Sequence, residues 1–147
     1  MKNILIVDGQ GGKIGASFVD QILKKNLKVD VLVVGTNALA TQSMMKAGAN
    51  QGATGENAVI YNSKHADIII APIGLMIENA LYGEVTTTIS NAILKSKAKK
   101  IILPFSRCGD FYFITESVSL NKLIDLGMAK LIQLINESEE TSCIQSI

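Results

Sequence analysis

The sequence predicts an α/β fold in which a single domain is built around a doubly wound, mainly parallel sheet. Three uninterrupted apolar runs are typical of strands buried on both faces of such a sheet, and they lie at residues 4–7, 31–34 and 68–71. Strand-like and helix-like patterns alternate along the chain, which favours parallel strands joined by crossover helices. A glycine-rich segment, residues 9–15, directly follows the first run. Together these observations predict about five strands, with the first strand central between those that begin near Val29 and Asp67.

The length and composition fit one folded domain and exclude several classes of protein. The 147 residues can bury a sizeable core, and 48% apolar against 18% charged residues indicates a folded chain. We predict one domain over residues 1–136 and a polar C-terminal tail over residues 137–147. The 14 basic and 13 acidic side chains nearly cancel and form no clustered basic face, so a nucleic-acid partner is not expected.

The cysteines and the apolar runs bear on the cellular compartment. Cys108 and Cys143 are far apart in the sequence and give no disulfide framework. The chain starts directly in a strand pattern, without a charged and then apolar signal segment. No apolar run reaches the roughly 20 residues that a membrane helix needs. The sequence therefore predicts a cytoplasmic protein without a membrane partner.

The first strand leads through the glycine segment into a helix that ends near Lys25. Ile14, Phe18 and Ile22 recur at helical spacing, and they predict the buried stripe of this helix. A second strand is predicted over residues 29–34, where nearly every side chain is β-branched or leucine.

The segment after the second strand contains capping and turn residues. A helix is predicted over residues 38–47, because Thr36 or Asn37 can cap its start and Gly48 can end it. Residues 49–57 contain two glycines and are interpreted as an irregular loop.

Strands and one helix follow in the second half of the chain. A short strand is predicted over residues 58–61, and a continuous apolar strand over residues 67–71 that ends at a Pro-Ile-Gly turn. A helix is then predicted over residues 86–96, followed by a strand over residues 100–104. Residues 111–115 are predicted to form an edge strand.

The last predicted helix begins after Ser119, which can cap it. Apolar residues at helical spacing predict its buried face: Leu120, Leu123, Ile124, Leu131, Leu134 and Ile135.

The glycine segment carries the main functional prediction. A strand, a glycine turn and a helix in immediate succession are typical of the start of a Rossmann-like nucleotide site. The spacing G-x-x-G-x-x-G is a variant, because Ile14 stands where a third glycine of G-x-G-x-x-G would be. Gly9 would let the strand turn, Gly11 or Gly12 would leave room for a pyrophosphate, and Gly15 would let the helix pack tightly on the sheet. The alternative is a tight β–α turn without a ligand, for which one glycine would suffice.

A second part of the dinucleotide pattern is missing from the sequence. An NAD site usually has an acidic residue at the end of the second strand, where it binds the ribose hydroxyls. Gly35, Thr36 and Asn37 stand there instead, and Asp30 lies at the wrong end of the strand. No arginine is close enough in sequence to accept a 2′-phosphate, so NADP gains little support. Thr36 and Asn37 can still hydrogen-bond a ribose or a phosphate.

The loops that follow parallel strands share one edge of the sheet, so we expect a common crevice there. The ligand is predicted to be a small phosphate-bearing molecule, with NAD(P) or another nucleotide as the cofactor. The predicted cofactor-binding residues are Gly9, Gln10, Gly11, Gly12, Lys13, Ile14, Gly15, Thr36, Asn37, Pro72, Ile73 and Gly74. No catalytic residue is assigned, and no cluster has the spacing of metal ligands.

Other candidate residues have weaker support. Cys108 lies beside Arg107, which can favour a thiolate, but no base is near in sequence, so an essential nucleophile is not expected. His65 is predicted at the sheet edge opposite the crevice. A loop after Gly74 could cover the crevice with a carboxylate that acts as a base or a metal ligand; the alternative is a surface or dimer-contact helix. The polar residues of that stretch are Glu78, Asn79 and Glu84.

Several segments taken together resemble a known protein family. They are the glycine segment, residues 35–41, residues 52–58 and residues 71–74. With these in view, the chain is similar to the bacterial domain-of-unknown-function 3842 family, from Lys2 to about Cys108 and more loosely in the last helix. The resemblance implies a Rossmann-like fold and a shared site, and it implies no catalytic residue.

Two functions from different classes therefore compete. The first is a nucleotide-binding protein and, more finely, an oxidoreductase; the second is a non-catalytic regulatory or assembly module that keeps the Rossmann-like shape. The glycine-rich segment favours the nucleotide-binding protein, and the short chain favours the non-catalytic module. A homodimer is predicted from apolar residues that exceed what one core needs: Leu75, Met76, Ile77, Leu81 and Tyr82.

Overall fold

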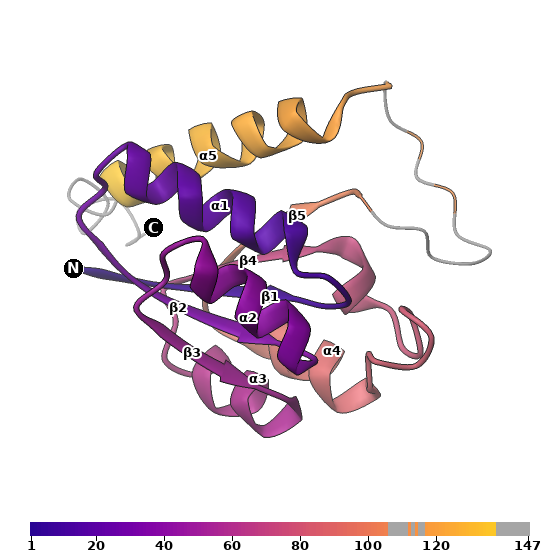
Figure 1. Cartoon of the computed structure of the whole chain (residues 1–147). Coiled ribbons are helices and arrows are strands. Elements are labelled where there is room, and N and C mark those ends of the chain that lie inside the picture. Colours follow the sequence, from indigo (N-terminus) through magenta and orange to yellow (C-terminus); the bar gives the residue numbers. More distant parts are fainter. Residues whose placement is uncertain (106–111, 113, 115–116, 138–147) are drawn as a thin grey trace, which may run out of the picture.

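A computed structural model of the chain describes residues 1–105, 112, 114 and 117–137. Its sheet has five parallel strands in the order β3-β2-β1-β4-β5 (Figure 1). The strands are β1 (Lys2–Asp8), β2 (Val29–Gly35), β3 (Gln51–Thr54), β4 (Ile68–Pro72) and β5 (Lys99–Leu103). The prediction of an α/β fold with a parallel sheet and a central first strand is confirmed. The strand order reverses between β1 and β4, which is where such folds bind ligands outside the carboxyl ends of the strands.

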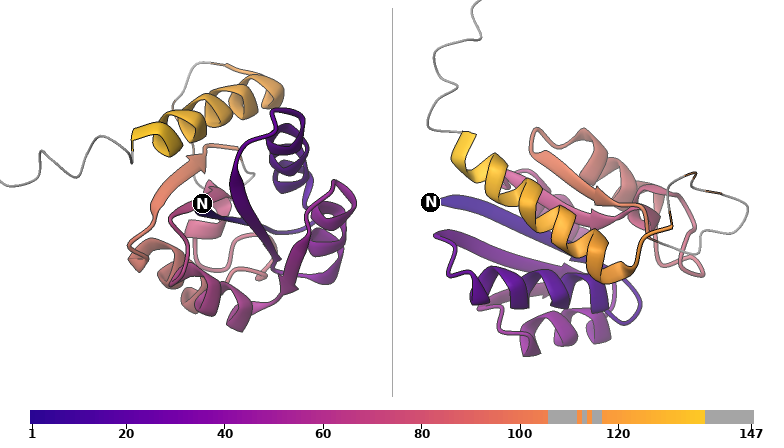
Figure 2. Two further views of the ribbon diagram at one scale, coloured as in Figure 1. Left: turned by 90° about the vertical axis from the view of Figure 1, so that its left-hand side faces the viewer. Right: turned by 90° about the horizontal axis from the view of Figure 1, so that it is seen from above.

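Helices cover both faces of the sheet (Figure 2). One face carries α1 (Lys13–Lys24), α2 (Ala38–Lys46) and α5 (Leu120–Glu137). The other carries α3 (Glu56–Ser63), the 3-10 turn η1 (Ile73–Met76) and α4 (Thr87–Lys95). This arrangement of helix layers on a parallel sheet is Rossmann-like and positions the carboxyl ends of all five strands at one edge.

Strand β1 shows why the central strands are apolar throughout. Its side chains alternate between the faces: Ile4 and Ile6 pack with Phe18 of α1 on one side, while Leu5 and Val7 belong to the core on the α3 and α4 side. All four of these strand residues are at most 2% exposed. An uninterrupted apolar run is therefore required at residues 4–7, because this part of β1 meets water on neither face.

The predictions for residues 49–61 were wrong in two respects. Residues 51–54 form the edge strand β3, which pairs only with β2 and is largely exposed, so it lacks the apolar run of a buried strand. Residues 58–61 belong to the helix α3 instead of a strand. Gly55 precedes this helix with φ +101°, and Val59 and Ser63 are buried four positions apart on one side of it.

The predicted helix caps are present. The Asn37 side chain accepts a hydrogen bond from the Ala40 N–H at 2.9 Å, and the Ser119 hydroxyl accepts one from the Lys122 N–H at 3.1 Å. In α5, Ile124 and the other predicted apolar positions face the core. The predicted edge strand over residues 111–115 falls largely outside the described residues. No helix in the described ranges is long and apolar enough to cross a membrane.

The apolar residues that favoured a homodimer are largely accommodated within one chain. Leu75 is buried, and Met76 and Leu81 pack against the core on the α4 side. Tyr82 is fully exposed. The homodimer stays a prediction.

Candidate functional site

Asp8 occupies the carboxyl end of β1 and organises the glycine loop. Its Oδ1 accepts a hydrogen bond from the Gly9 N–H and its Oδ2 accepts one from the Gly15 N–H, both at 2.8 Å. The first N–H groups of a helix have no partner within the helix, so this carboxylate supplies an acceptor to the first turn of α1. The chain itself thus satisfies part of the donor set that the sequence assigned to a ligand phosphate.

The same carboxylate is almost completely buried. Burial raises the pKa of Asp8 to about 6, even though hydrogen bonds from the backbone, that of Gly15 foremost, act to lower it. The negative charge of Glu84 adds to the rise. A carboxylate with a raised pKa therefore lies beneath the glycine loop, at the carboxyl end of β1.

Two of the loop glycines are explained by the packing of α1 against α2. A Cβ on Gly12 would lie 2.6 Å from the Ala40 carbonyl oxygen, and Gly12 has the left-handed φ of +68°. A Cβ on Gly15 would collide with the Met44 side chain. Gly12 thus serves the close approach of α2 rather than that of a ligand.

Gly9 and Gly11 differ in their surroundings. A Cβ on Gly9 would lie 2.5 Å from the Leu81 Cδ1 and 3.6 Å from the Leu75 Cδ2, so side chains that follow β4 close over this glycine. A Cβ on Gly11 would have only the Lys13 Cγ as a neighbour, at 4.0 Å. Of the two positions predicted to leave room for a pyrophosphate, Gly11 is the open one.

A carboxylate from a distant segment joins the loops after β1 and β2. The Glu84 Oε1 accepts hydrogen bonds from the Thr36 hydroxyl at 2.8 Å, the Asn37 side-chain amide at 2.5 Å and the Gln10 N–H at 3.3 Å. The Asn37 amide also donates to the Gln10 carbonyl at 3.0 Å. Thr36 and Asn37 therefore lie beside the glycine loop, as predicted, and their donors already have an acceptor.

Residues 77–85, here named the covering loop, bring Glu84 to this place. The loop is closed by a hydrogen bond from the Asn79 N–H to the Val85 carbonyl at 2.8 Å. Asn79, Leu81 and Tyr82 all have positive φ, between 56° and 63°. Such conformations are uncommon outside glycine and persist where surrounding contacts hold them. The loop expected after Gly74 is this segment, and its Leu81 lies over Gly9. That it covers a ligand stays a prediction.

The turn after β4 contributes indirectly. Pro72 ends β4 and Gly74 is buried in η1, and it is Leu75, the next residue, that reaches the glycine loop. Arg107 and Cys108 lie outside the described residues. Among the described residues, no group of three or more His, Cys, Asp or Glu side chains is arranged to hold a metal ion.

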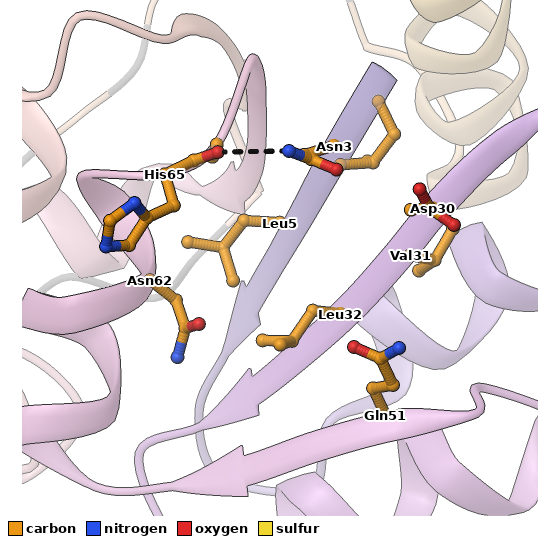
Figure 3. Close-up of a pocket in the computed structure, with 10 residues that line it drawn as sticks. Asn3, Leu5, Asp30, Val31, Leu32, Gln51, Asn62 and His65 are labelled. Atoms are coloured by element: carbon orange, nitrogen blue, oxygen red, sulfur yellow. Dashed lines mark hydrogen bonds between the residues drawn. The ribbon is translucent and has the colours of Figure 1, made fainter. Parts of the chain in front are cut away.

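A separate pocket of about 120 Å³ lies at the opposite, amino end of the strands (Figure 3). The apolar side chains of Leu5 and Leu32 lie between polar residues that surround them: Asn3, Asp30, Gln51, Asn62 and His65. The His65 ring packs against the Tyr61 ring with 4.8 Å between their centroids. His65 lies at the amino end of the strands, which is the end of the sheet where it was predicted.

Two features of this site do not follow from the sequence patterns, namely the contacts of Asp8 and those of Glu84. Asp8 was read only as the end of the first strand; the signal was a single acidic residue between an apolar run and a glycine turn. The bond network of Glu84 had no local signal, because its partners Thr36 and Asn37 are almost 50 positions away.

Two of the solved structures with a similar fold have low sequence identity to this chain. Apo saccharopine dehydrogenase (L-Glu forming) from Saccharomyces cerevisiae is 16% identical with a TM-score of 0.46, and the match covers 73% of this chain and 22% of that one. A dodecameric FMN-dependent UbiX-like decarboxylase from Escherichia coli O157:H7 is 16% identical with a TM-score of 0.44, over 89% of this chain and 75% of that one.

Sequence comparison is more decisive. No curated protein matches the chain. A family model matches residues 3–136, which is most of the chain. The chain therefore belongs to the family described as Domain of unknown function (DUF3842).

Proposed function

We propose that the protein binds a nucleotide or dinucleotide at the crevice outside β1 and β4, with a phosphate against Gly11 and the start of α1. The observation that carries this proposal is the unexplained glycine at position 11. Gly11 does not have the positive φ of its neighbour Gly12, and a Cβ there would meet no atom of the described residues closer than 4.0 Å. Neither backbone conformation nor packing requires this glycine, whereas a phosphate that approaches the backbone does.

The donors around Gly11 support an anion at this place. Asp8 uses the N–H of Gly9 and of Gly15, and Glu84 uses the N–H of Gln10. The N–H of Gly11 donates to no acceptor within the described residues. Lys13, exposed at the first position of α1, adds a positive charge at the positive end of the helix dipole.

NAD(P) is the cofactor that this site would hold if the protein is an oxidoreductase, the finer form of the proposal. Bound there, the cofactor would supply hydride transfer. The residues of this chain would bind its phosphates and ribose, at Gly11, Lys13, Thr36 and Asn37.

One observation favours the alternative, a non-catalytic regulatory or assembly module. Asp8 and Glu84 already accept hydrogen bonds from N–H groups that a phosphate would otherwise use. Two carboxylates near the loop also oppose a second negative charge. The two proposed functions therefore differ in whether Gly11 and Lys13 are sufficient to bind an anion.

The test is calorimetric titration of ADP and NAD⁺ into the wild type and two variants. Gly11→Val fills the open space and Lys13→Gln removes the charge, so each is expected to weaken binding at least tenfold, a change of about 1.4 kcal/mol. Lys25→Gln at the other end of α1 is the charge-matched control and should bind like the wild type. Gly12→Val is unsuitable, because its clash with Ala40 would disturb the fold itself.

Circular dichroism shows whether each variant is folded. If the wild type binds neither ADP nor NAD⁺, or if folded Gly11→Val and Lys13→Gln bind as well as the wild type, the loop is a turn and the module is the better interpretation.

A further inference from the structure

The carboxylate of Glu84 lies where a dinucleotide site needs an acidic residue. In dinucleotide-binding folds, an acid at the carboxyl end of the second strand binds the ribose hydroxyl. In this chain β2 ends at Gly35 and is followed by Thr36 and Asn37, neither of which is acidic. Both of these side chains donate to the Glu84 Oε1. The negative charge absent from β2 is thus delivered to the same place by the covering loop.

The contacts of Glu84 fix its orientation and leave one oxygen open. All three of its hydrogen bonds, from Gln10, Thr36 and Asn37, end on Oε1. Oε2 accepts no hydrogen bond from the described residues. A carboxylate that is held by one oxygen can present the other to a hydroxyl donor without reorganisation, which favours binding.

The backbone conformation of the covering loop holds the Glu84 carboxylate in this position. Leu81 anchors the loop over Gly9, and the Asn79–Val85 hydrogen bond closes it. Three non-glycine residues with positive φ, at positions 79, 81 and 82, precede Glu84. Strained backbone of this kind occurs where a fold must hold a group in one position, and here the group held is the carboxylate.

The charges near Glu84 determine which ribose would be accepted. The first basic residue after β2 is Lys46, at the far end of α2. Asp8 lies close enough for the charge of Glu84 to raise its pKa. A 2′-phosphate at this place would meet two carboxylates and no arginine fork, whereas a free hydroxyl would donate to Oε2.

We propose that Glu84 is a specificity-determining residue that binds the ribose hydroxyl of the ligand and excludes ligands with a 2′-phosphate. This inference rests on the proposed nucleotide binding, and it narrows the ligand class to nucleotides with an unmodified ribose, NAD⁺ rather than NADP⁺.

The experiment compares the affinities for NAD⁺ and NADP⁺ in the full-length chain by calorimetry. The wild type is expected to bind NAD⁺ at least tenfold more tightly than NADP⁺. Glu84→Gln keeps the length of the side chain and an oxygen for Thr36 and Asn37 but removes the charge, so the ratio should fall at least fivefold. Glu78→Gln is the matched control: it removes the same charge from an exposed site in the covering loop, and the ratio should stay that of the wild type.

A second comparison needs no substitution. The wild type should bind AMP at least tenfold more tightly than adenosine 2′,5′-bisphosphate, which differs from AMP only by the 2′-phosphate. This result remains informative if Glu84→Gln does not fold.

The outcomes separate the two proposals. Equal affinity of the wild type for NAD⁺ and NADP⁺, or an unchanged ratio in folded Glu84→Gln, overturns the role of Glu84 and leaves nucleotide binding in place. Failure of the wild type to bind ADP, NAD⁺ and NADP⁺ overturns nucleotide binding, and the role of Glu84 with it.

Discussion

The two ends of the sheet differ: the pocket lies at the amino end of the strands, and the network of polar contacts around Glu84 lies at the carboxyl end. At the amino end, a pocket is open, but its two polar side-chain bonds end on backbone carbonyls: the Asn62 amide donates to Ala58 in its own helix, and the Asn3 side-chain amide donates to His65 (Figure 3). At the carboxyl end, the chain fills the space above Gly9 with Leu81, yet loops from three strands meet on one carboxylate. The proposed site therefore rests on the convergence of polar groups on Glu84 and not on the volume of a pocket.

The largest expected effect tests whether helix packing requires the glycine at position 12 but not the glycine at position 11. Gly12→Ala places a Cβ against the Ala40 backbone at a left-handed φ, so we expect a loss of about 3 kcal/mol or more in the free energy of unfolding. Gly11→Ala should change it by less than about 0.5 kcal/mol, as an open surface position does. Urea denaturation measures both. Equal losses at the two positions would show that Gly11 is also a packing residue.

A pH profile tests the buried carboxylate at the carboxyl end. Burial raises the pKa of Asp8 from its ordinary value of 3.8 to about 6 in the fold, so the folded state binds more protons between these values. The contribution of Asp8 to stability is therefore present below about pH 4 and is lost as the pH rises through about 6, by about 3 kcal/mol.

Asp8→Asn should flatten this part of the curve of unfolding free energy against pH, measured by urea denaturation at each pH. The variant also loses one backbone hydrogen bond, which lowers stability at every pH without adding a slope. Asp125→Asn on the exposed side of α5 is the control and should keep the slope of the wild type. A slope that persists in Asp8→Asn would assign it to another group.

The smallest effect concerns the amino end. His65→Ala removes the ring contact with Tyr61 but keeps the backbone carbonyl that accepts from Asn3. We expect a loss of about 0.5 kcal/mol in the free energy of unfolding and an ADP affinity within about twofold of the wild type. A tenfold weaker ADP affinity in a folded variant would move the nucleotide site to the pocket at the amino end.

The elements that sequence patterns predicted well are those whose burial is set by their own residues. Strand β4, residues 4–8 of β1 and the carboxyl half of β2 are buried on both faces, and their apolar runs follow from that. Helix α3 was mistaken for a strand because Ala58, Val59, Ile60 and Tyr61 include β-branched and aromatic residues, while its helical form depends on the turn at Gly55 and on packing against α4. Tertiary contacts override local preference in such short elements.

The sequence predicted where the candidate site lies in the fold, but not which contacts its residues make. The shared edge of a parallel sheet follows from topology, so Thr36 and Asn37 were expected beside the glycine loop. That Gly12 serves α2, and that Glu84 bonds to Thr36, depends on how helices and loops pack in three dimensions. No pattern within a short window of the sequence encodes a contact between segments that meet only after folding.

The central position of β1 has a consequence for how the chain is made. Ribosomes release β1 first, but Ile4 pairs alongside Ile68, so one edge of β1 has no strand to bond until β4 has been synthesised. An open edge on an apolar strand is a template for pairing with other chains. Nascent chains that stall before Ile68 are therefore the species most exposed to aggregation, and chaperones that shield the first strand would act in that interval.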